Sequence, residues 1–339
     1  MKRYRGENLP ENPRIAVIAN DALGNFVAAT PLLQMLRYKW DPCHIFYIGG
    51  TRTAELQAAS DLFEDTFVLH GFPWRKSVEK LTERRPYDLI VNMEQQLIAR
   101  ACVPVLADED SFVVGPAMNY DGRGELPYSD DEVGRLAADK NWLDTDTPQR
   151  YSFLDSGFIG EIFCRLCYLE GPVPTYKVPS ADPELDIPDV LIATAASLPE
   201  KLWPIEKWIA TIQAIQQSSN PAIRVGLLGA KPSEQGKHWK GADEEEKLIE
   251  AGVEDLRGLF TLPQVVGALE RARAVLTIDN GILHLATAAG TPTVGLFRHG
   301  IHRLWAPPFA NLTVLTPGEG REVAEIELET VREAIARAL

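Results

Sequence analysis

The sequence lacks any run of apolar residues long enough to span a membrane, which takes about 18 or more in succession. Its N-terminal segment, MKRYRGENLPENPR, is basic but lacks the apolar core that a secretory signal needs. We therefore expect a soluble, cytoplasmic protein without a transmembrane segment. An excess of positive charge is also missing, because 48 acidic residues outnumber 34 lysines and arginines and leave a formal net charge of −14. This balance argues against a nucleic acid partner and, more weakly, against tight docking on an anionic membrane.

Cysteine is scarce as well. The residues Cys43, Cys102, Cys164 and Cys167 are too few and too scattered for a disulfide framework. Cys164 and Cys167 form a CxxC pair within a segment of helical periodicity, and a second such pair is missing. We therefore expect these two cysteines on one face of a core helix, and not at a metal site.

The length and composition are those of a folded protein with about two domains. Of the 339 residues, 45% are hydrophobic and 24% are charged. Apolar runs alternate with helical segments in both halves, which predicts right-handed βαβ units, parallel sheets and an α/β fold. Strands are expected at 14–19, 44–48, 66–69, 88–92 and 112–114 in the first half, and at 190–193, 223–228, 274–278 and 293–297 in the second.

The proline-rich segment 170–189 predicts an interdomain connection. We accordingly expect domains at 1–175 and 176–325, followed by an amphipathic helix at 326–339. The segment 119–150 is rich in Asp, Gly and Pro and has two interpretations. It is either solvated loop and surface helix or a loop over a binding cleft.

The stretch 274–297, AVLTIDNGILHLATAAGTPTVGLF, has the pattern of a strand, a tight turn, a short helix and a second strand. Gly290 and Pro292 are typical of the residues that follow a helix end. A helix that begins directly after a buried parallel strand presents free N–H groups and the positive end of its dipole. The turn Asp279-Asn280-Gly281 therefore predicts an anion site, and Gly281 allows a ligand to approach the backbone closely.

This stretch resembles the D-[ST]-G-x-x-H-L-A-A signature of glycosyltransferase family 9, the heptosyltransferases of inner-core lipopolysaccharide. Three more stretches resemble family segments in the same order. They are NDALGNFVAATPLLQML in the first loop and helix, SLPEKLWPIEKW at the lysine-Trp-Pro segment, and DLRGLFTLPQVVGALERA before the signature. Each motif is weak to moderate alone, and their shared order from Arg14 to Pro317 carries the resemblance.

The resemblance implies a GT-B architecture, in which two Rossmann-like domains with parallel sheets face a central cleft. It also implies an inverting transfer from a nucleotide diphosphate sugar, commonly ADP-heptose, with no metal and no cofactor. The N-terminal domain would take the acceptor and the C-terminal domain the donor. The residues expected at the donor are Gly24, Thr194, Ser197, Lys201, Gly229, Asp279, Asn280, Gly281, His284 and Arg298.

Lys201 is the clearest electrostatic candidate, because the matching family lysine contacts the diphosphate and a fixed ammonium stabilises charge on the leaving group. Asn280 replaces the Ser or Thr that is usual in the family. His284 is placed in the first helical turn, where a proton donor helps to hold an anion, or where it is a structural histidine. Arg298 begins a basic loop that also contains His299, His302 and Arg303. This loop has two interpretations, a contact to a phosphate of a substrate or a solvated surface loop.

The first loop departs from the family pattern. The family carries Gly-Asp where this chain has Gly24-Asn25, and that aspartate is the proposed base for the acceptor hydroxyl. Asparagine does not accept a proton usefully near neutral pH. Asp21 either supplies the carboxylate or forms the turn, and Asn25 remains as a residue that positions the acceptor. The helix that follows starts either at Thr30-Pro31 or nearer Asn25, with Pro31 inside it.

The leading hypothesis is a metal-independent, inverting glycosyltransferase, with Asp21, Asn25 and Lys201 as its catalytic residues. The acceptor is a soluble metabolite or a glycolipid of the lipopolysaccharide core. The alternative is a catalytically lapsed family member that binds a nucleotide sugar or a protein partner without transfer, and Asn25 motivates it.

Overall fold

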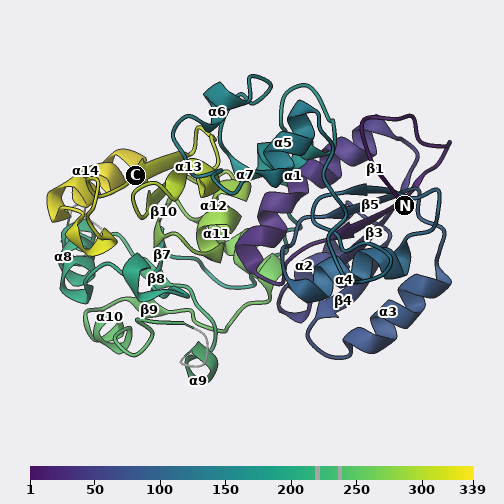
Figure 1. Cartoon of the computed structure of the whole chain (residues 1–339). Coiled ribbons are helices and arrows are strands. Elements are labelled where there is room, and N and C mark those ends of the chain that lie inside the picture. Colours follow the sequence, from purple (N-terminus) through teal and green to yellow (C-terminus); the bar gives the residue numbers. More distant parts are fainter. Residues whose placement is uncertain (218–221, 236–238) are drawn as a thin grey trace. The chain divides into compact units, whose positions relative to one another are not determined.

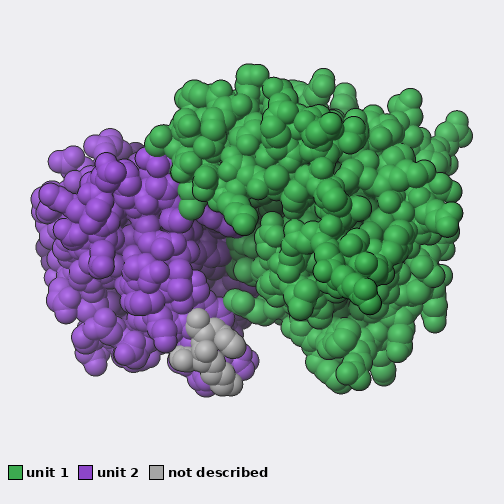
Figure 2. Space-filling view, viewed as in Figure 1, with its two compact units in different colours: residues 1–177 green, residues 178–339 purple. Residues whose placement is uncertain are grey.

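The computed structural model describes residues 1–217, 222–235 and 239–339. The chain divides into two compact units, Met1–Lys177 and Val178–Leu339 (Figure 2). Within the described residues each unit contains a six-stranded sheet in which all neighbouring strands are parallel. The predicted α/β fold with two parallel sheets is confirmed.

In unit 1 the sheet has the strand order β1-β6-β5-β2-β3-β4 (Figure 1). These strands are β1 (Lys2–Arg3), β2 (Arg14–Ile18), β3 (His44–Gly50), β4 (Asp65–His70), β5 (Leu89–Asn92) and β6 (Phe112–Val114). The helical elements of the unit are α1 (Leu23–Lys39), η1 (Thr51–Thr53), α2 (Ala54–Ala59), α3 (Trp74–Glu83), α4 (Leu97–Leu106), α5 (Glu132–Ala138), α6 (Thr147–Arg150) and α7 (Ile159–Leu166).

In unit 2 the order is β12-β11-β10-β7-β8-β9. The strands are β7 (Val190–Ala193), β8 (Val225–Leu227), β9 (Glu254–Asp255), β10 (Ala274–Ile278), β11 (Thr293–Leu296) and β12 (Leu312–Leu315). The helical elements are η2 (Pro199–Lys201), α8 (Ile205–Gln217), α9 (Pro232–Gln235), α10 (Glu246–Glu250), α11 (Leu262–Arg271), α12 (Gly281–Ala288), α13 (His302–Trp305), η3 (Val323–Glu325) and α14 (Leu328–Ala338).

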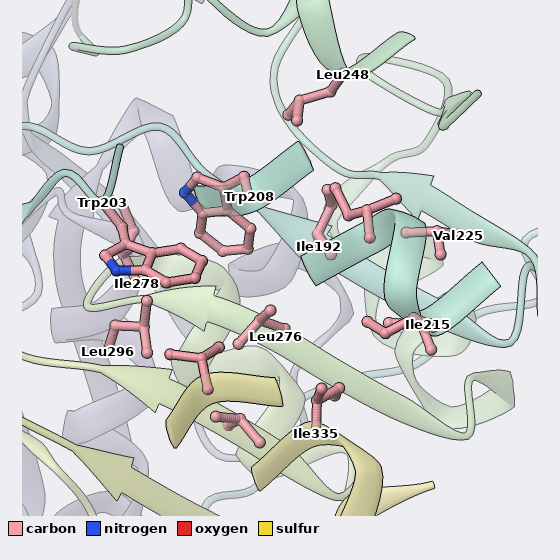
Figure 3. Packing of buried hydrophobic residues seen from close by; sticks show 14 of the residues in the cluster. Ile192, Trp203, Trp208, Ile215, Val225, Leu248, Leu276, Ile278, Leu296 and Ile335 are labelled. Carbon is pink, nitrogen blue, oxygen red and sulfur yellow. The ribbon is translucent and has the colours of Figure 1, made fainter. Parts of the chain in front are cut away.

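The core of unit 2 forms where every second strand residue meets α8, α10 and α14. Ile192, Leu276 and Leu296 point into this core, as the period of two in a strand requires (Figure 3). Two indole rings lie against them, since the Trp203 and Trp208 ring centroids are 5.4 Å apart and nearly perpendicular. The α14 helix packs on β10 and β11, so the C-terminal helix belongs to the fold of this unit.

Helix α1 settles the choice between two starts. It begins at Leu23, directly after the β2 turn, and Pro31 lies in its interior. Proline has no N–H to bond the carbonyl four residues earlier, which here is that of Val27. The Thr30 hydroxyl donates to that carbonyl oxygen at 2.7 Å, so the group that proline leaves unsatisfied has a partner. The start at Thr30-Pro31 is therefore wrong, and Gly24 and Asn25 belong to a helix and not to a loop.

The paired cysteines are both core residues, but only Cys164 lies within the expected helix. Cys164 is on α7 and Cys167 follows the helix end, and both are fully buried as free thiols. Burial raises the pKa of both thiols, which makes them poor nucleophiles. The expectation of core residues is confirmed.

The segment 119–150 contains α5 and α6 and is held by hydrogen bonds within unit 1. Asp131 caps α5 by accepting from the Gly134 amide at 2.7 Å, and it also accepts from the Tyr168 hydroxyl at 2.6 Å. Arg150 forms ion pairs with Asp139 at 3.0 Å and Asp144 at 3.1 Å. The segment is thus folded, and a role in acceptor binding stays a prediction.

Candidate functional site

The carboxyl edge of the unit 2 sheet is where the loops after β7 and β10 meet. Chain order runs from β7 to β9 on one side and from β10 to β12 on the other, so the order reverses between β7 and β10. In sheets of this kind, ligands bind outside the carboxyl ends of the strands at this reversal. Residues 194–204 and 279–281 are therefore the local candidates for a binding site.

Asn280 joins these two loops. It is the N-cap of α12, because its Oδ1 accepts from the amides of Ile282 at 3.0 Å and Leu283 at 3.2 Å. Its Nδ2 donates to the carbonyl oxygen of Ala195, beyond β7, at 3.3 Å. The predicted strand, turn and helix of 274–297 are confirmed, and the helix ends before Gly290, which has a φ of +78°.

The cap predicts a measurable loss of stability. Asn280→Ala is expected to lower the free energy of unfolding by about 1 kcal/mol, because the first amides of α12 lose their acceptor. Asn280→Ser keeps an acceptor oxygen and is the matched control. Urea unfolding followed by circular dichroism measures both, and equal stability of the two variants would contradict the capping role.

Lys201 and Asp279 form an ion pair across the reversal point. The Lys201 Nζ lies 2.7 Å from Asp279 Oδ2 and donates to the Asp279 carbonyl oxygen at 3.0 Å. Only 16% of the Lys201 side chain and 7% of the Asp279 side chain are exposed. An ammonium has three donors, and these contacts use two of them. The structure therefore brings the two predicted residues together and leaves Lys201 capacity for one further anionic contact.

His284 lies in the first turn of α12 and is 2% exposed. Burial lowers its pKa from 6.5 to about 4, and the Lys201 charge acts in the same direction while Asp279 opposes it. The imidazole is therefore neutral near pH 7. Its ring centroid lies 6.4 Å from that of Trp305, at a steep angle. A neutral imidazole carries no charge and donates at most one hydrogen bond. The positively charged side chain at this helix start is therefore that of Lys201.

The loop after β11 also reaches this edge. Arg298 Nη1 lies 3.3 Å from Glu200 Oε1, and Glu200 precedes Lys201 in η2. The buried Arg298 Nε has no hydrogen-bond partner among the described residues. Burial lowers the pKa of His302 in the same loop. Arg298 is thus tied to the Lys201 segment, whereas Ser197 is exposed and takes part in no side-chain hydrogen bond of the described residues.

Thr194 and Gly229 border a buried polar network. The Thr194 hydroxyl donates to Glu245 Oε1 at 2.8 Å, and Glu245 is fully buried. Arg257, 5% exposed, lies 3.4 Å from Glu245 Oε2 and forms hydrogen bonds with Asp255 at 2.8 Å. At Gly229 a Cβ atom would lie 2.5 Å from a Gln235 nitrogen. These contacts fix the ends of β7 and β8, and a donor contact of Thr194 or Gly229 stays a prediction.

In unit 1 the order of strands reverses between β2 and β5. Gly24 and Asn25 lie in the first turn of α1 and are half-buried. Asp21 precedes the helix and accepts from the Arg52 amide at 2.9 Å. Its carboxylate packs so closely on Gly50 that a Cβ there would lie 2.0 Å from Oδ1. Burial raises the pKa of Asp21, and the Arg52 amide partly opposes this.

The sequence of residues 174–331 matches the family model described as glycosyltransferase family 9 (heptosyltransferase). A comparison with curated proteins found no match. The fold is similar to that of the glycosyl transferase family 9 protein from Veillonella parvula, with a TM-score of 0.73, 16% identity, and 97% and 98% of the two chains covered. Residues 174–331 are thus similar in sequence to glycosyltransferase family 9, and the chain as a whole is similar in fold to a member of that family.

Two Escherichia coli structures have the same fold. ADP-heptose lipopolysaccharide heptosyltransferase II matches with a TM-score of 0.66 at 18% identity, over 96% of this chain and 98% of that one. Heptosyltransferase WaaC, solved with ADP-2-deoxy-2-fluoro heptose, matches with a TM-score of 0.63 at 16% identity, over 96% of this chain and 100% of that one. The predicted GT-B fold is confirmed, and the resemblance to glycosyltransferase family 9 is supported by the family model over residues 174–331.

The sequence did not point to several polar residues that the structure places at or near the two sheet edges. Glu94 follows β5 in unit 1, and its carboxylate accepts a hydrogen bond from the Asn20 side chain. The available signal was a carboxylate two residues beyond the end of a predicted strand. Glu245 and Arg257 gave less signal, because three consecutive glutamates at 244–246 resemble a solvated helix start. Only the fold shows which of the three is buried.

Proposed function

We propose that this protein is an inverting, metal-independent glycosyltransferase that moves a heptose from ADP-heptose to an acceptor hydroxyl. The observation that carries the proposal is the Lys201–Asp279 pair at the start of α12, on the reversal point of the unit 2 sheet. A diphosphate at this helix start meets the positive end of the helix dipole and one ammonium donor, while the Ile282 and Leu283 amides already bond to Asn280 Oδ1. These groups supply positive charge where the leaving group develops negative charge.

In the proposed reaction the acceptor oxygen attacks the anomeric carbon from the face opposite the diphosphate, which inverts that centre. The bond from the anomeric carbon to the phosphate oxygen breaks, and ADP leaves with the electron pair. A carboxylate takes the acceptor proton. The sequence-based candidates are Asp21 for the base and Asn25 for a residue that orients the acceptor.

The ADP moiety and the heptose are inferred from two similar proteins, whose names include ADP-heptose and a fluorinated ADP-heptose. The acceptor is a glycolipid of the lipopolysaccharide core or a soluble metabolite, with the charge of −14 favouring the soluble class over a strongly anionic surface. None of the helices in the described residues is long and apolar enough to cross a membrane.

A nucleotide comparison tests the donor assignment. ADP at about 100 times its Kd is expected to raise the free energy of unfolding by about 2.7 kcal/mol, because only the native state binds it. UDP, GDP and dTDP at the same concentration are the matched controls. Thermal unfolding measures the shifts, and a larger shift with another nucleotide would reassign the donor base.

The second candidate function is nucleotide-sugar binding without transfer, which the asparagine at position 25 favours. Incubation with ADP-heptose separates the two functions. Release of ADP together with a glycosylated product supports transfer by the wild-type protein. Nucleotide binding without release, with activity only in Asn25→Asp, supports the lapsed form.

A further inference from the structure

The edge of the unit 1 sheet holds two carboxylates, Asp21 and Glu94, which flank Asn20. We propose that Glu94, and not Asp21, is the general base that takes the proton of the acceptor hydroxyl. This inference rests on the proposed glycosyl transfer. It follows from how each carboxylate is held, since both follow strands at the point where the chain order reverses.

Glu94 is fixed in position by two asparagines. Asn92, which is 1% exposed, accepts from the Glu94 amide at 2.9 Å and donates to the Glu94 carbonyl oxygen at 2.9 Å. Asn20 donates from Nδ2 to Glu94 Oε2. The amide of Gln95 donates to Glu94 Oε1 at 2.9 Å. Backbone and carboxylate are therefore both positioned, as a group that must meet a reacting proton requires.

The partners of this carboxylate carry no charge. Asn20, Asn92 and the Gln95 amide orient it without neutralising it. In the part of the chain that the structure describes, no lysine, arginine or histidine forms an ion pair with Glu94. Glu125 in the same unit, by contrast, is paired with Arg100. An unneutralised, half-buried carboxylate that is held by amides suits proton abstraction.

Asn20 also connects Glu94 to the segment where the family resemblance places the base. Asn20 Oδ1 accepts from the Ala22 amide at 2.7 Å, so one side chain holds both the turn before α1 and the Glu94 carboxylate. Asn25 lies in the first turn of that helix. The carboxylate that is missing from position 25 is thus supplied at the same turn by a residue of the loop after β5.

Asp21 has a structural role instead. Its Oδ1 accepts from the Arg52 amide at the start of the helical turn η1, and the same atom packs on Gly50. This contact ties the end of β2 to the end of β3. Asp21 Oδ1 thus serves the junction between the two strand ends.

The proposed step is a balanced proton transfer. As the acceptor oxygen bonds to the anomeric carbon, its proton passes to a Glu94 carboxylate oxygen. The bond between the anomeric carbon and the phosphate oxygen breaks at the same time, and ADP carries away the electron pair. Glu94 then returns its proton to solvent before the next turnover.

The experiment measures ADP release from ADP-heptose by the full-length protein, with lipopolysaccharide core oligosaccharide as acceptor and with water alone. Glu94→Gln is expected to lower kcat by about 10² to 10⁴, the usual contribution of general base catalysis. Its ADP affinity, measured by thermal shift, stays at the wild-type value, which excludes a folding defect. Glu83→Gln, an exposed glutamate at the end of α3, is the matched control.

A second substitution and the pH profile test further whether Glu94 is the general base. Adding Asn25→Asp to Glu94→Gln is expected to restore part of kcat, because a carboxylate returns to the same turn. The acidic limb of the kcat/KM profile is expected to vanish in Glu94→Gln.

Two results overturn the inference. Wild-type kcat in Glu94→Gln together with a large loss in Asp21→Asn assigns the proton to Asp21 and leaves the proposed transfer intact. Nucleotide binding without any ADP release by the wild-type protein overturns the proposed transfer itself, and the role of Glu94 with it.

Discussion

Replacing Lys201 by methionine is expected to lower kcat by about 10² to 10³, the usual cost of removing one group that stabilises transition-state charge. The same change is expected to lower the free energy of unfolding by about 3 kcal/mol, because it leaves a buried carboxylate without its partner. The 7% exposure of Asp279 and the 2.7 Å contact are the reasons for this large effect. Steady-state kinetics with ADP-heptose and urea unfolding measure the two losses.

A double variant separates the two roles of Lys201. Lys201→Met with Asp279→Asn removes both charges, so most of the stability is expected to return while kcat stays low. Lys247→Met is the matched control in the same unit, because Lys247 and Glu244 form an exposed pair at 3.0 Å. Exposed pairs contribute about 0 to 1 kcal/mol, so this variant is expected to stay near wild type. A stable Lys201→Met protein with wild-type kcat would contradict the site.

The fold was largely predictable because its signals are local. Buried parallel strands such as 190–193 and 274–278 are continuous apolar runs, and Gly290 marks the end of α12 with its positive φ. The strands β1, β9 and β12 were not predicted. β1 and β9 have two residues each, Lys2–Arg3 and Glu254–Asp255, and such short charged edges carry no periodicity. β12, Leu312–Leu315, is a partly exposed edge strand of four residues.

The site was predictable only where one segment contains it. The turn at 279–281 could be identified from the sequence, because its strand, cap and helix are contiguous. The Lys201–Asp279 pair joins loops 78 residues apart, and the Asn20–Glu94 bond joins residues 74 apart. Such pairs form only because particular strands are neighbours in the sheet. The order of strands depends on the whole sheet, so these contacts could not be predicted from local sequence.

The interior proline of α1 illustrates a different limit. The sequence allowed Pro31 either at the first helical position or inside the helix, since both obey the rules for proline. The deciding contact is the Thr30 hydroxyl on the Val27 carbonyl oxygen. The two arrangements differ in where the helix begins, and in the structure it begins at Leu23.

The wild-type protein is expected to lose stability faster than His284→Gln as the pH falls from 6.5 to about 4. The native pKa of His284 is lowered to about 4 by burial, whereas the unfolded chain has a value of 6.5. Between these values the unfolded state takes up a proton that the native state refuses, so acid favours unfolding. About 3 kcal/mol of stability is lost as the pH falls through this window, and it is retained above it.

The observable is the difference between the two unfolding curves, measured in urea at several values of pH, because the 48 acidic residues also titrate in this range and affect both proteins alike. Parallel curves would mean that His284 takes up its proton at the same pH in the native and unfolded states, which would contradict the lowered pKa. The same argument extends to the ligand. A neutral imidazole gives ADP no charge to bind at pH 7, so His284→Gln is expected to leave the pH dependence of ADP affinity unchanged above pH 6.5. If ADP affinity depends on a positive charge at the start of α12, we expect that charge to be the Lys201 ammonium, which is held there by Asp279.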